Sequence, residues 1–136
     1  MIKKIIGNSH NDDRGKLLFS NNLDLSAVKR MYVIENKSTE FERAWQAHKV
    51  ESRWFTAISG SFQIKLIKID DFEFPSENLI SETYFLKSES LDSLIIEPGY
   101  ASSIQALEDN SKLLVYSDFQ KDEIDDNYKF DPNKWK

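Results

Sequence analysis

Hydrophobic and polar residues alternate in short runs along most of the chain. Such alternation, in which every second side chain is apolar, is typical of β-strands with one buried face. The runs that are rich in β-branched and aromatic residues lie at 30–34, 53–58, 61–69, 80–86, 93–96, 103–107 and 112–116. No long segment repeats apolar residues at helical spacing, and 22–29 predicts a single helical turn at most. The pattern therefore predicts about eight to ten strands and very little helix.

Turn-forming residues separate these runs. Clusters of Gly, Pro, Asn, Asp and Ser occur at 11–15, 59–60, 75–78, 98–99 and 109–110. Their spacing is typical of a sandwich or barrel of short strands, and a jelly roll fits it best. The 136 residues match the length of one domain and contain no linker or repeat, so we expect a single domain over residues 1–136. The acidic stretch 121–127 predicts a solvated turn.

Composition excludes several functional classes. The chain has 18 Lys and Arg against 23 Asp and Glu, a net charge of −5, whereas a nucleic-acid partner requires dense positive charge. There is no cysteine, which excludes disulfides, thiolate zinc sites and a cysteine nucleophile and fits a reducing compartment. No apolar run approaches the roughly 18 residues of a membrane helix, and the first six residues are too short for a signal peptide. We therefore expect a cytoplasmic protein that contacts neither nucleic acid nor membrane.

Missing motifs narrow the chemistry further. The four glycines form no dinucleotide-binding fingerprint, no P-loop and no hydrolase nucleophile elbow. His10 and His48 are the only histidines, so a metal site would need carboxylates in place of most of the usual imidazole ligands. We therefore expect no metal and no other cofactor.

The segment 43–49 has the most informative pattern. As a strand, it would place Gln46 and His48 on one face and Arg43, Trp45 and Lys49 on the other. A histidine that faces a barrel interior can accept a proton, because its unperturbed pKa is the closest of any side chain to neutrality. The same pattern also fits a histidine that is only held by a structural hydrogen bond, so the residues alone leave both interpretations open.

The charged residues that follow this segment fit a simpler role. Lys49, Glu51 and Arg53 have the pattern of a solvated strand edge. The tryptophans Trp45 and Trp54 fit packing in the core or at an interface. None of these residues needs a ligand to explain it.

Six short segments occur in an order that resembles a known superfamily. They lie at 13–15, 28–32, 43–49, 59–61, 98–101 and 117–119, and the ending 130–135 is similar to the Asp-Pro…Trp ending of the same proteins. This order resembles the dTDP-4-dehydrorhamnose 3,5-epimerase (RmlC-like cupin) superfamily, and within it the WxcM-like dTDP-sugar 3,4-ketoisomerases most of all. The resemblance covers nearly the whole chain. It implies an all-β cupin jelly roll, or double-stranded β-helix, that forms a homodimer without metal.

The resemblance also implies a substrate and the residues that bind it. Proteins of this kind act on a dTDP-linked 4-keto-6-deoxyhexose and serve the synthesis of surface polysaccharides. Arg14 matches the arginine of a turn that contacts the nucleotide diphosphate, and Arg43 matches the arginine that opens the histidine motif. Both would hold the diphosphate through charge-assisted hydrogen bonds. Lys49 matches the last lysine of the histidine motif and is a further candidate for substrate binding.

Catalysis in this interpretation removes a proton next to the ketone. His48 matches the second histidine of the ketoisomerase motif and would be the base. Tyr116 lies near the position of the epimerases' catalytic tyrosine. The enolate that forms needs hydrogen-bond donors, for which Gln46 and either Tyr100 or Tyr116 are the candidates.

Three positions depart from the pattern. Ala44 stands in place of a glycine, Gln46 in place of the first histidine, and Ser102, a candidate substrate contact, in place of a histidine after the Pro-Gly pair. An amide cannot act as a base, so two alternatives stay open. The protein could be a cupin that binds a nucleotide-sugar or glycan without converting it, or a small-molecule cupin that binds a metal through His48 and Glu51.

Overall fold

The computed structural model describes residues 2–119 and 125–135, and within them it contains twelve β-strands and no helix. All of the paired strands run antiparallel. The strands are β1 (Ile2–Ile5), β2 (Asn8–Asp12), β3 (Gly15–Phe19), β4 (Arg30–Ile34), β5 (Glu42–His48), β6 (Arg53–Ser59), β7 (Ser61–Lys68), β8 (Glu82–Lys87), β9 (Ser93–Ile96), β10 (Tyr100–Ala106), β11 (Lys112–Ser117) and β12 (Tyr128–Lys129).

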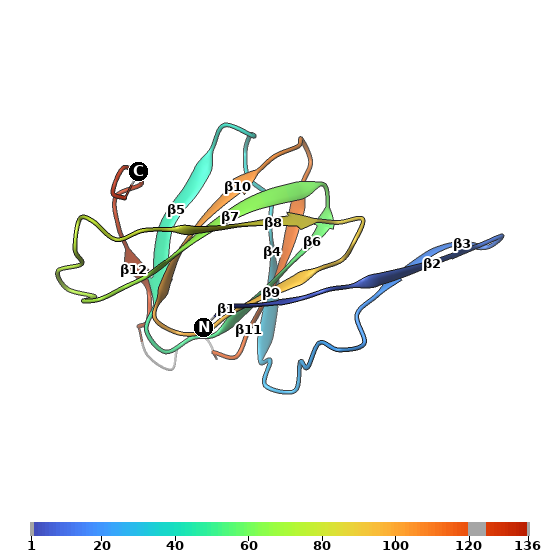
Figure 1. Cartoon of the computed structure of the whole chain (residues 1–136), viewed down its shortest axis with the longest axis horizontal. Coiled ribbons are helices and arrows are strands. Elements are labelled where there is room, and N and C mark those ends of the chain that lie inside the picture. Colours follow the sequence, from blue (N-terminus) through green and yellow to red (C-terminus); the bar gives the residue numbers. More distant parts are fainter. Residues whose placement is uncertain (1, 120–124, 136) are drawn as a thin grey trace.

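Two five-stranded sheets pack face to face, and a separate hairpin projects from them (Figure 1). The first sheet has the order β1-β9-β6-β11-β4, and the second has the order β12-β5-β10-β7-β8. Except for β7 and β8, neighbouring strands within each sheet are not consecutive in the sequence, which is the topology of a jelly roll. The all-β jelly roll that the sequence predicts is therefore confirmed.

The hydrophobic core lies between the two sheets. Alternate residues of β6, β7, β10 and β11 point inward, as the period of two predicts, and include the fully buried Phe55, Ile64 and Val115. The turn between β6 and β7 depends on Gly60, whose φ of 68° is one that side chains rarely adopt. A Cβ at this position would also lie 2.0 Å from the Ser111 Oγ. The interior is apolar at this end and becomes polar toward the opposite end of β5 and β6.

The outer face of the second sheet is covered by the end of the chain. Trp45 and Ala47 of β5 point outward and pack with Phe130 and Trp135. The Trp45 indole donates a hydrogen bond to the Lys134 carbonyl oxygen at 2.8 Å. Because Trp45 and Ala47 point outward, Gln46 and His48 between and beside them point into the interior.

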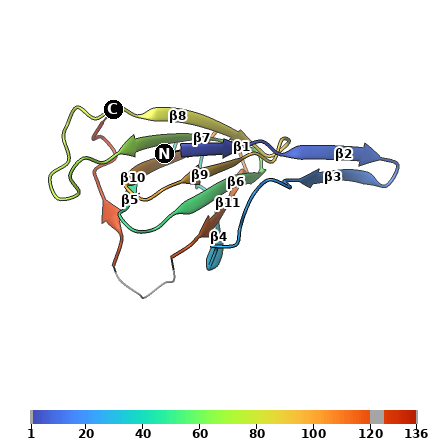
Figure 2. The ribbon, with the colours of Figure 1, turned by 60° about the horizontal axis from the view of Figure 1, so that its bottom comes forward.

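The hairpin of β2 and β3 stands away from the two sheets (Figure 2). All five residues of β2 are exposed, and so are the first three of β3. Gly15, with a φ of 131°, lies at its tip and follows the Asp13-Arg14 turn. This hairpin has no core of its own in a single chain.

Most strand positions were predicted correctly. The strands at 30–34 and 93–96 match the sequence prediction residue for residue, while 80–86 begins two residues later, at Glu82. The stretch 22–29 forms turns and bends without a helical turn. Of the acidic stretch 121–127, residues 121–124 lie outside the described part of the chain. No helix among the described residues is long and apolar enough to cross a membrane.

Candidate functional site

A β-bulge in β5 brings Arg43 and Gln46 to the same side of the sheet. Ser102 of β10 pairs with Gln46, but Ile104, two residues on, pairs with Arg43, so β5 has one extra residue between the two pairs. The sequence prediction that Arg43 lies on the face opposite Gln46 is therefore wrong. Strict alternation fails here because the extra residue shifts the side-chain period by one.

Both residues line a cavity of about 490 Å³ that opens at one end of the interior between the sheets. Strands β4, β5, β6 and β10 contribute to its wall, together with the segment that precedes β12. Its lining consists of Arg30, Tyr32, Val33, Ile34, Glu35, Arg43, Gln46, Arg53, Ile104 and Asn127. We refer to these residues as the arginine cavity.

Three guanidinium groups give the arginine cavity its positive charge. Arg53 is the most deeply buried, at 3% exposure, and its Nη2 donates to the Ser102 Oγ at 3.3 Å. Burial lowers its pKa, and the nearby Tyr32 and Glu51 oppose that effect. Arg43 lies at the rim and donates through Nε to Asn36. The acidic residue of the lining, Glu35, forms an ion pair with Lys112 at 3.0 Å.

His48 follows Gln46 by two residues on the same strand and is 5% exposed, and it is not among the residues that line the arginine cavity. Its Nδ1 lies 2.9 Å from the Asp126 carbonyl oxygen. A carbonyl oxygen only accepts, so Nδ1 carries the hydrogen and Nε2 keeps the lone pair that can take a proton. Burial lowers the pKa of His48 to about 4, and the positive charge of Arg53 acts in the same direction. The imidazole is therefore neutral at physiological pH.

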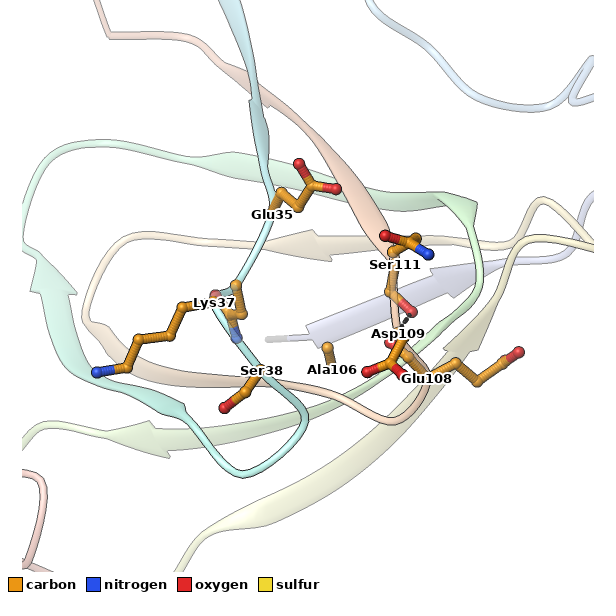
Figure 3. A pocket seen from close by; sticks show the side chains of 9 residues that line it. Glu35, Lys37, Ser38, Ala106, Glu108, Asp109 and Ser111 are labelled. Atoms are coloured by element: carbon orange, nitrogen blue, oxygen red, sulfur yellow. Dashed lines mark hydrogen bonds between the residues drawn. The ribbon is translucent and has the colours of Figure 1, made fainter.

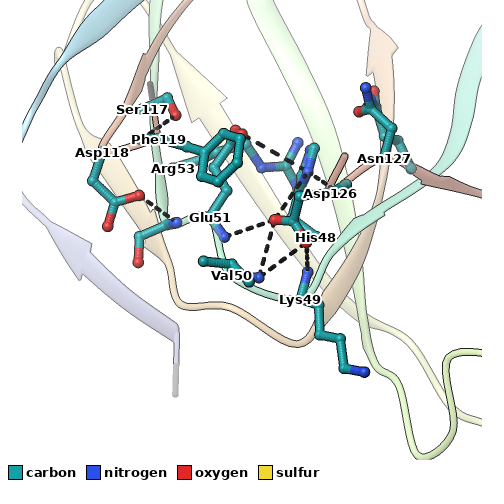
Figure 4. Close-up of polar contacts among 12 residues, drawn as sticks. His48, Lys49, Val50, Glu51, Arg53, Ser117, Asp118, Phe119, Asp126 and Asn127 are labelled. Atoms are coloured by element: carbon teal, nitrogen blue, oxygen red, sulfur yellow. Dashed lines mark hydrogen bonds and ion pairs between the residues drawn. The ribbon is translucent and has the colours of Figure 1, made fainter. Parts of the chain in front are cut away.

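The turn after His48 is held by the carboxylate of Asp126 (Figure 4). Asp126 is buried and accepts hydrogen bonds from the backbone N–H groups of Lys49, Val50 and Glu51 at 2.9 to 3.2 Å. The same residue thus fixes the imidazole through its carbonyl and the turn through its side chain.

Glu51 and Arg53 are buried beside His48, so the prediction that they form a solvated strand edge is wrong. Glu51 is 3% exposed, and its Oε1 lies 3.5 Å from the Arg30 Nη2. Burial raises the pKa of Glu51, and the positive charges of Arg53 and Arg30 oppose that shift. The turn after β5 brings both residues inward, because β6 starts with Arg53 on the same face as the buried Phe55.

The structure does not bring Tyr116 to this site. On β11, Leu113, Val115 and Ser117 are the buried residues, so Tyr116 lies on the outer face of the first sheet, beside Trp54 in the register. The proposed catalytic role of Tyr116 is therefore wrong on geometry. The residues before and after Tyr116 in the strand point inward, so Tyr116 itself points outward. Tyr32 of β4 supplies a tyrosine to the cavity instead.

Tyr100, Ser102 and Lys49 differ in their placement. Ser102 is 1% exposed and contacts Arg53. Tyr100 stands opposite His48 in the register of β10 and β5 but packs against the hydrophobic core rather than lining the cavity. Lys49 is exposed, and its Nζ lies 5.9 Å from the Phe72 ring centre on the outer side of the sheet. Of the three, only Ser102 adjoins the arginine cavity.

Arg14 lies on the projecting hairpin, apart from the arginine cavity. Its side chain is 84% exposed and pairs with Asp12 at 2.6 Å. The hydrogen bond with Arg14 holds the pKa of Asp12 below its usual value. His10, Lys16 and Gly15 lie beside it around a shallow hollow. Within one chain Arg14 and Arg43 do not share a site.

The sequence interpretation missed Arg53, Arg30 and Tyr32. The inward position of Arg53 could have been predicted from the sequence. Arg53, Phe55 and Ala57 are alternate residues of one strand, so they lie on the same, inward face. An ionic residue at an inward position needs a partner or a ligand. Arg30 and Tyr32 are likewise alternate residues of β4, so both lie on the face that lines the cavity.

A second polar hollow of about 550 Å³ adjoins the rim of the arginine cavity (Figure 3). Glu35 and Asn36 border it on one side, and Glu108, Asp109 and Asn110 on the other. Among the described residues, no group of three or more His, Cys, Asp or Glu side chains is placed to hold a metal ion.

Several solved structures share this fold. A mutant of the 3,4-ketoisomerase QdtA from Thermoanaerobacterium thermosaccharolyticum, in complex with TDP-4-keto-6-deoxyglucose, is 21% identical with a TM-score of 0.68, covering 93% of this chain and 85% of that one. The TDP-quinovose 3,4-ketoisomerase WlaRB from Campylobacter jejuni is 22% identical with a TM-score of 0.71, covering 95% and 92%. A dTDP-4-dehydrorhamnose 3,5-epimerase from Bacillus anthracis is 14% identical with a TM-score of 0.76, covering 97% and 79%.

The sequence itself matches one family. The model of the WxcM-like, C-terminal family matches residues 2–135. No curated protein matches the chain significantly. The resemblance that the six ordered segments indicate is thus confirmed by the family match and by the fold of the solved structures.

Proposed function

The chain belongs to the WxcM-like, C-terminal family, and we propose that it is an isomerase or epimerase of a dTDP-linked 4-keto-6-deoxyhexose. The reaction would be a 3,4-ketoisomerisation or an epimerisation at a single carbon, and its product would serve the synthesis of surface polysaccharide. Solved proteins of the same fold include a 3,4-ketoisomerase in complex with TDP-4-keto-6-deoxyglucose, a TDP-quinovose 3,4-ketoisomerase and a dTDP-4-dehydrorhamnose 3,5-epimerase. Their fold supports the class of reaction, and the residues of this chain support the choice within it.

The observation that carries the proposal is a neutral imidazole next to a buried guanidinium. His48 keeps a free lone pair on Nε2, since its Nδ1 donates to the Asp126 carbonyl. Arg53 lies beside it and lowers its pKa. A base and a strong hydrogen-bond donor in one buried site are the two groups that proton removal next to a ketone requires.

In this mechanism His48 Nε2 takes the proton from C3 of the sugar. The electron pair of the broken C–H bond forms the C3–C4 double bond, and the ketone oxygen becomes an enolate oxygen. Arg53 and Tyr32 donate hydrogen bonds to this oxygen, and Ser102 holds the guanidinium of Arg53. Delivery of a proton to C4, with transfer of the C3 hydroxyl proton to the enolate oxygen on C4, completes a ketoisomerisation. Delivery of a proton to the opposite face of C3 completes an epimerisation.

The nucleotide end of the substrate would meet the rim of the arginine cavity. Arg43 is exposed there and has donors left after its bond to Asn36. Arg14 would come to the same diphosphate from the projecting hairpin of a second copy, because it lies apart from the cavity of its own chain. Binding energy from the diphosphate would then position the sugar over His48.

The proposal is tested by proton exchange in deuterated water. Incubation with dTDP-4-keto-6-deoxyglucose should exchange the C3 hydrogen of the substrate for deuterium, and a ketoisomerised product, whose C3 is the carbonyl carbon, should carry deuterium at C4. NMR should show both in proportion to the amount of protein. Absence of exchange, with clear binding of dTDP, would contradict the enzymatic proposal. It would favour a non-catalytic protein that binds a nucleotide-sugar.

The binding protein is the second candidate, and one observation favours it. Gln46 occupies the place of a histidine, and its amide donates to the Asn127 side chain at 2.8 Å. A site with a single imidazole has lost half of the acid–base groups that its relatives' motif provides. The deuterium experiment separates the two candidates, since both predict binding and only the enzyme predicts exchange.

A further inference from the structure

A buried acid with no assigned task lies behind the proposed base. Glu51 Oε1 is 3.8 Å from the His48 Nδ1 and 3.5 Å from the Arg30 Nη2. Its Oε2 is buried, and no described residue gives it a hydrogen bond of good geometry. A buried carboxylate is costly unless another charge balances it, so a fold that keeps one here indicates a local need for negative charge.

The positive charges of Arg30 and Arg53 already balance this carboxylate, and a protonated His48 would add a third positive charge beside it. The imidazolium would form in a buried site in which Arg53 and Arg30 both oppose a further positive charge. The carboxylate of Asp126 lies 3.8 Å from the imidazole, but it already accepts hydrogen bonds from three backbone N–H groups of the turn. Glu51 lies at the same distance, and although the Ser117 side chain is close enough to lower the pKa of Glu51, its Oε2 accepts no hydrogen bond of good geometry from a described residue.

The other ionisable groups around His48 add no charge next to its ring near neutral pH. Tyr100 stands opposite His48 on β10 and carries no charge near neutral pH, because burial raises its pKa. Burial likewise raises the pKa of Tyr32 on β4. Lys49 follows His48 in the chain but reaches toward Phe72 on the outer face. Arg53, Asp126 and Arg30 shift the pKa of His48, and Glu51 is a further ionisable group 3.8 Å from the ring.

We propose that Glu51 is a positioning residue that supplies the counter-charge for the protonated His48 during turnover. This role rests on the proposed function, because His48 becomes protonated during turnover only if it is the base of that reaction. Glu51 lies on the Nδ1 side of the ring, away from the nitrogen that would take the proton, so it acts through His48 and not on the sugar. A negative charge 3.8 Å away favours the charged form of the ring and so strengthens a base that burial weakens.

The test compares Glu51→Gln with the wild type in two measurements. Glu51→Gln keeps the shape of the side chain and removes the charge. We expect the pKa of His48 to fall by about one unit, measured by NMR titration, because one neighbouring charge is worth about that much. We also expect kcat for deuterium exchange to fall about tenfold with KM unchanged, since the substrate does not touch Glu51.

Two controls and one reserve variant keep the result decisive. Glu40→Gln removes an exposed negative charge away from the site and should leave both measurements unchanged. The exposed His10 gives an internal reference in the same spectra, and it is the only other histidine. Glu51→Asp keeps the charge and should keep most of the activity. If Glu51→Gln does not fold, Glu51→Ala, which also removes the charge, carries the test with a decrease of the same sign in both measurements.

The outcomes separate this inference from the proposed function. An unchanged pKa of His48 and an unchanged kcat in folded Glu51→Gln would overturn the role of Glu51 and leave the proposed function intact. No exchange in the wild type would instead contradict the proposed function. In that case the NMR titration alone decides whether Glu51 balances the charge of His48, and an unchanged pKa rejects it.

Discussion

At the scale of single residues, His48 decides which carbon of the sugar can react. One base on one face can move a proton between adjacent carbons, whereas inversion on both sides of a ketone needs more than this cavity offers once Gln46 replaces an imidazole. We predict exchange with deuterium at C3, little at C5, and none in His48→Asn. NMR of dTDP-4-keto-6-deoxyglucose in deuterated water measures all three. Comparable exchange at both carbons, or full activity in His48→Asn, would reject His48 as the single base.

Burial, and after it the charge of Arg53, set the pH range in which that base works. The pKa of His48 is about 4, so His48 should be neutral and active above about pH 5 and lose activity as the pH falls through 4. Arg53→Gln removes the nearby positive charge and should move the pKa of His48, and with it the acid limb of the pH–rate profile, upward. Arg53→Lys keeps the charge and should keep the limb near its original position. An acid limb that stays in place in Arg53→Gln would show that burial alone controls His48.

At the scale of the elements, the alternation of side chains predicted where strands lie better than which way their residues face. The fold followed from runs such as 30–34 and 93–96, in which the period of two is unbroken. The face on which Arg43 lies could not be predicted from the alternation, because the bulge in β5 is set by pairing with β10, which is far away in the sequence. A shift of one residue likewise separates Tyr116 from the interior. The buried partners of His48 could not be predicted either, since Asp126 meets it only through the folded chain.

The projecting hairpin makes a prediction of its own about the nucleotide. If Arg14 grips the diphosphate, dTDP should raise the melting temperature, and Arg14→Ala should remove most of that shift, because one charge-assisted contact is worth about 1.5–3 kcal/mol. The melting temperature without ligand should hardly change, since Arg14 is 84% exposed and its ion pair with Asp12 is open to solvent. Differential scanning fluorimetry measures both, with Lys87→Ala as an exposed-charge control. No response to dTDP in the wild type would remove the main support for a nucleotide-sugar.

At the scale of the whole molecule, a single chain leaves two features incomplete. The outer face of the first sheet exposes apolar side chains, with Met31 at 68%, Val33 at 51% and Ile58 at 43%. The hairpin that carries Arg14 projects from the same body without packing against it (Figure 2). A second copy on that face would cover the apolar residues and could bring its hairpin to the arginine cavity. Assembly and nucleotide binding would then depend on each other.

We therefore predict a homodimer at micromolar concentration, with a mass by light scattering of twice the 15.9 kDa of the chain. The double variant Met31→Lys and Ile58→Lys places two charges on the exposed face and should give a folded monomer with an unchanged circular dichroism spectrum. Because Arg14 would then have no neighbouring cavity to reach, the same variant should lose the stabilisation by dTDP as fully as Arg14→Ala does. Ile80→Lys, at a position that is 87% exposed on another loop, should keep both the dimer and the dTDP response. A wild-type monomer that still binds dTDP through Arg14 would reject the assembly and require the hairpin to fold back onto its own chain.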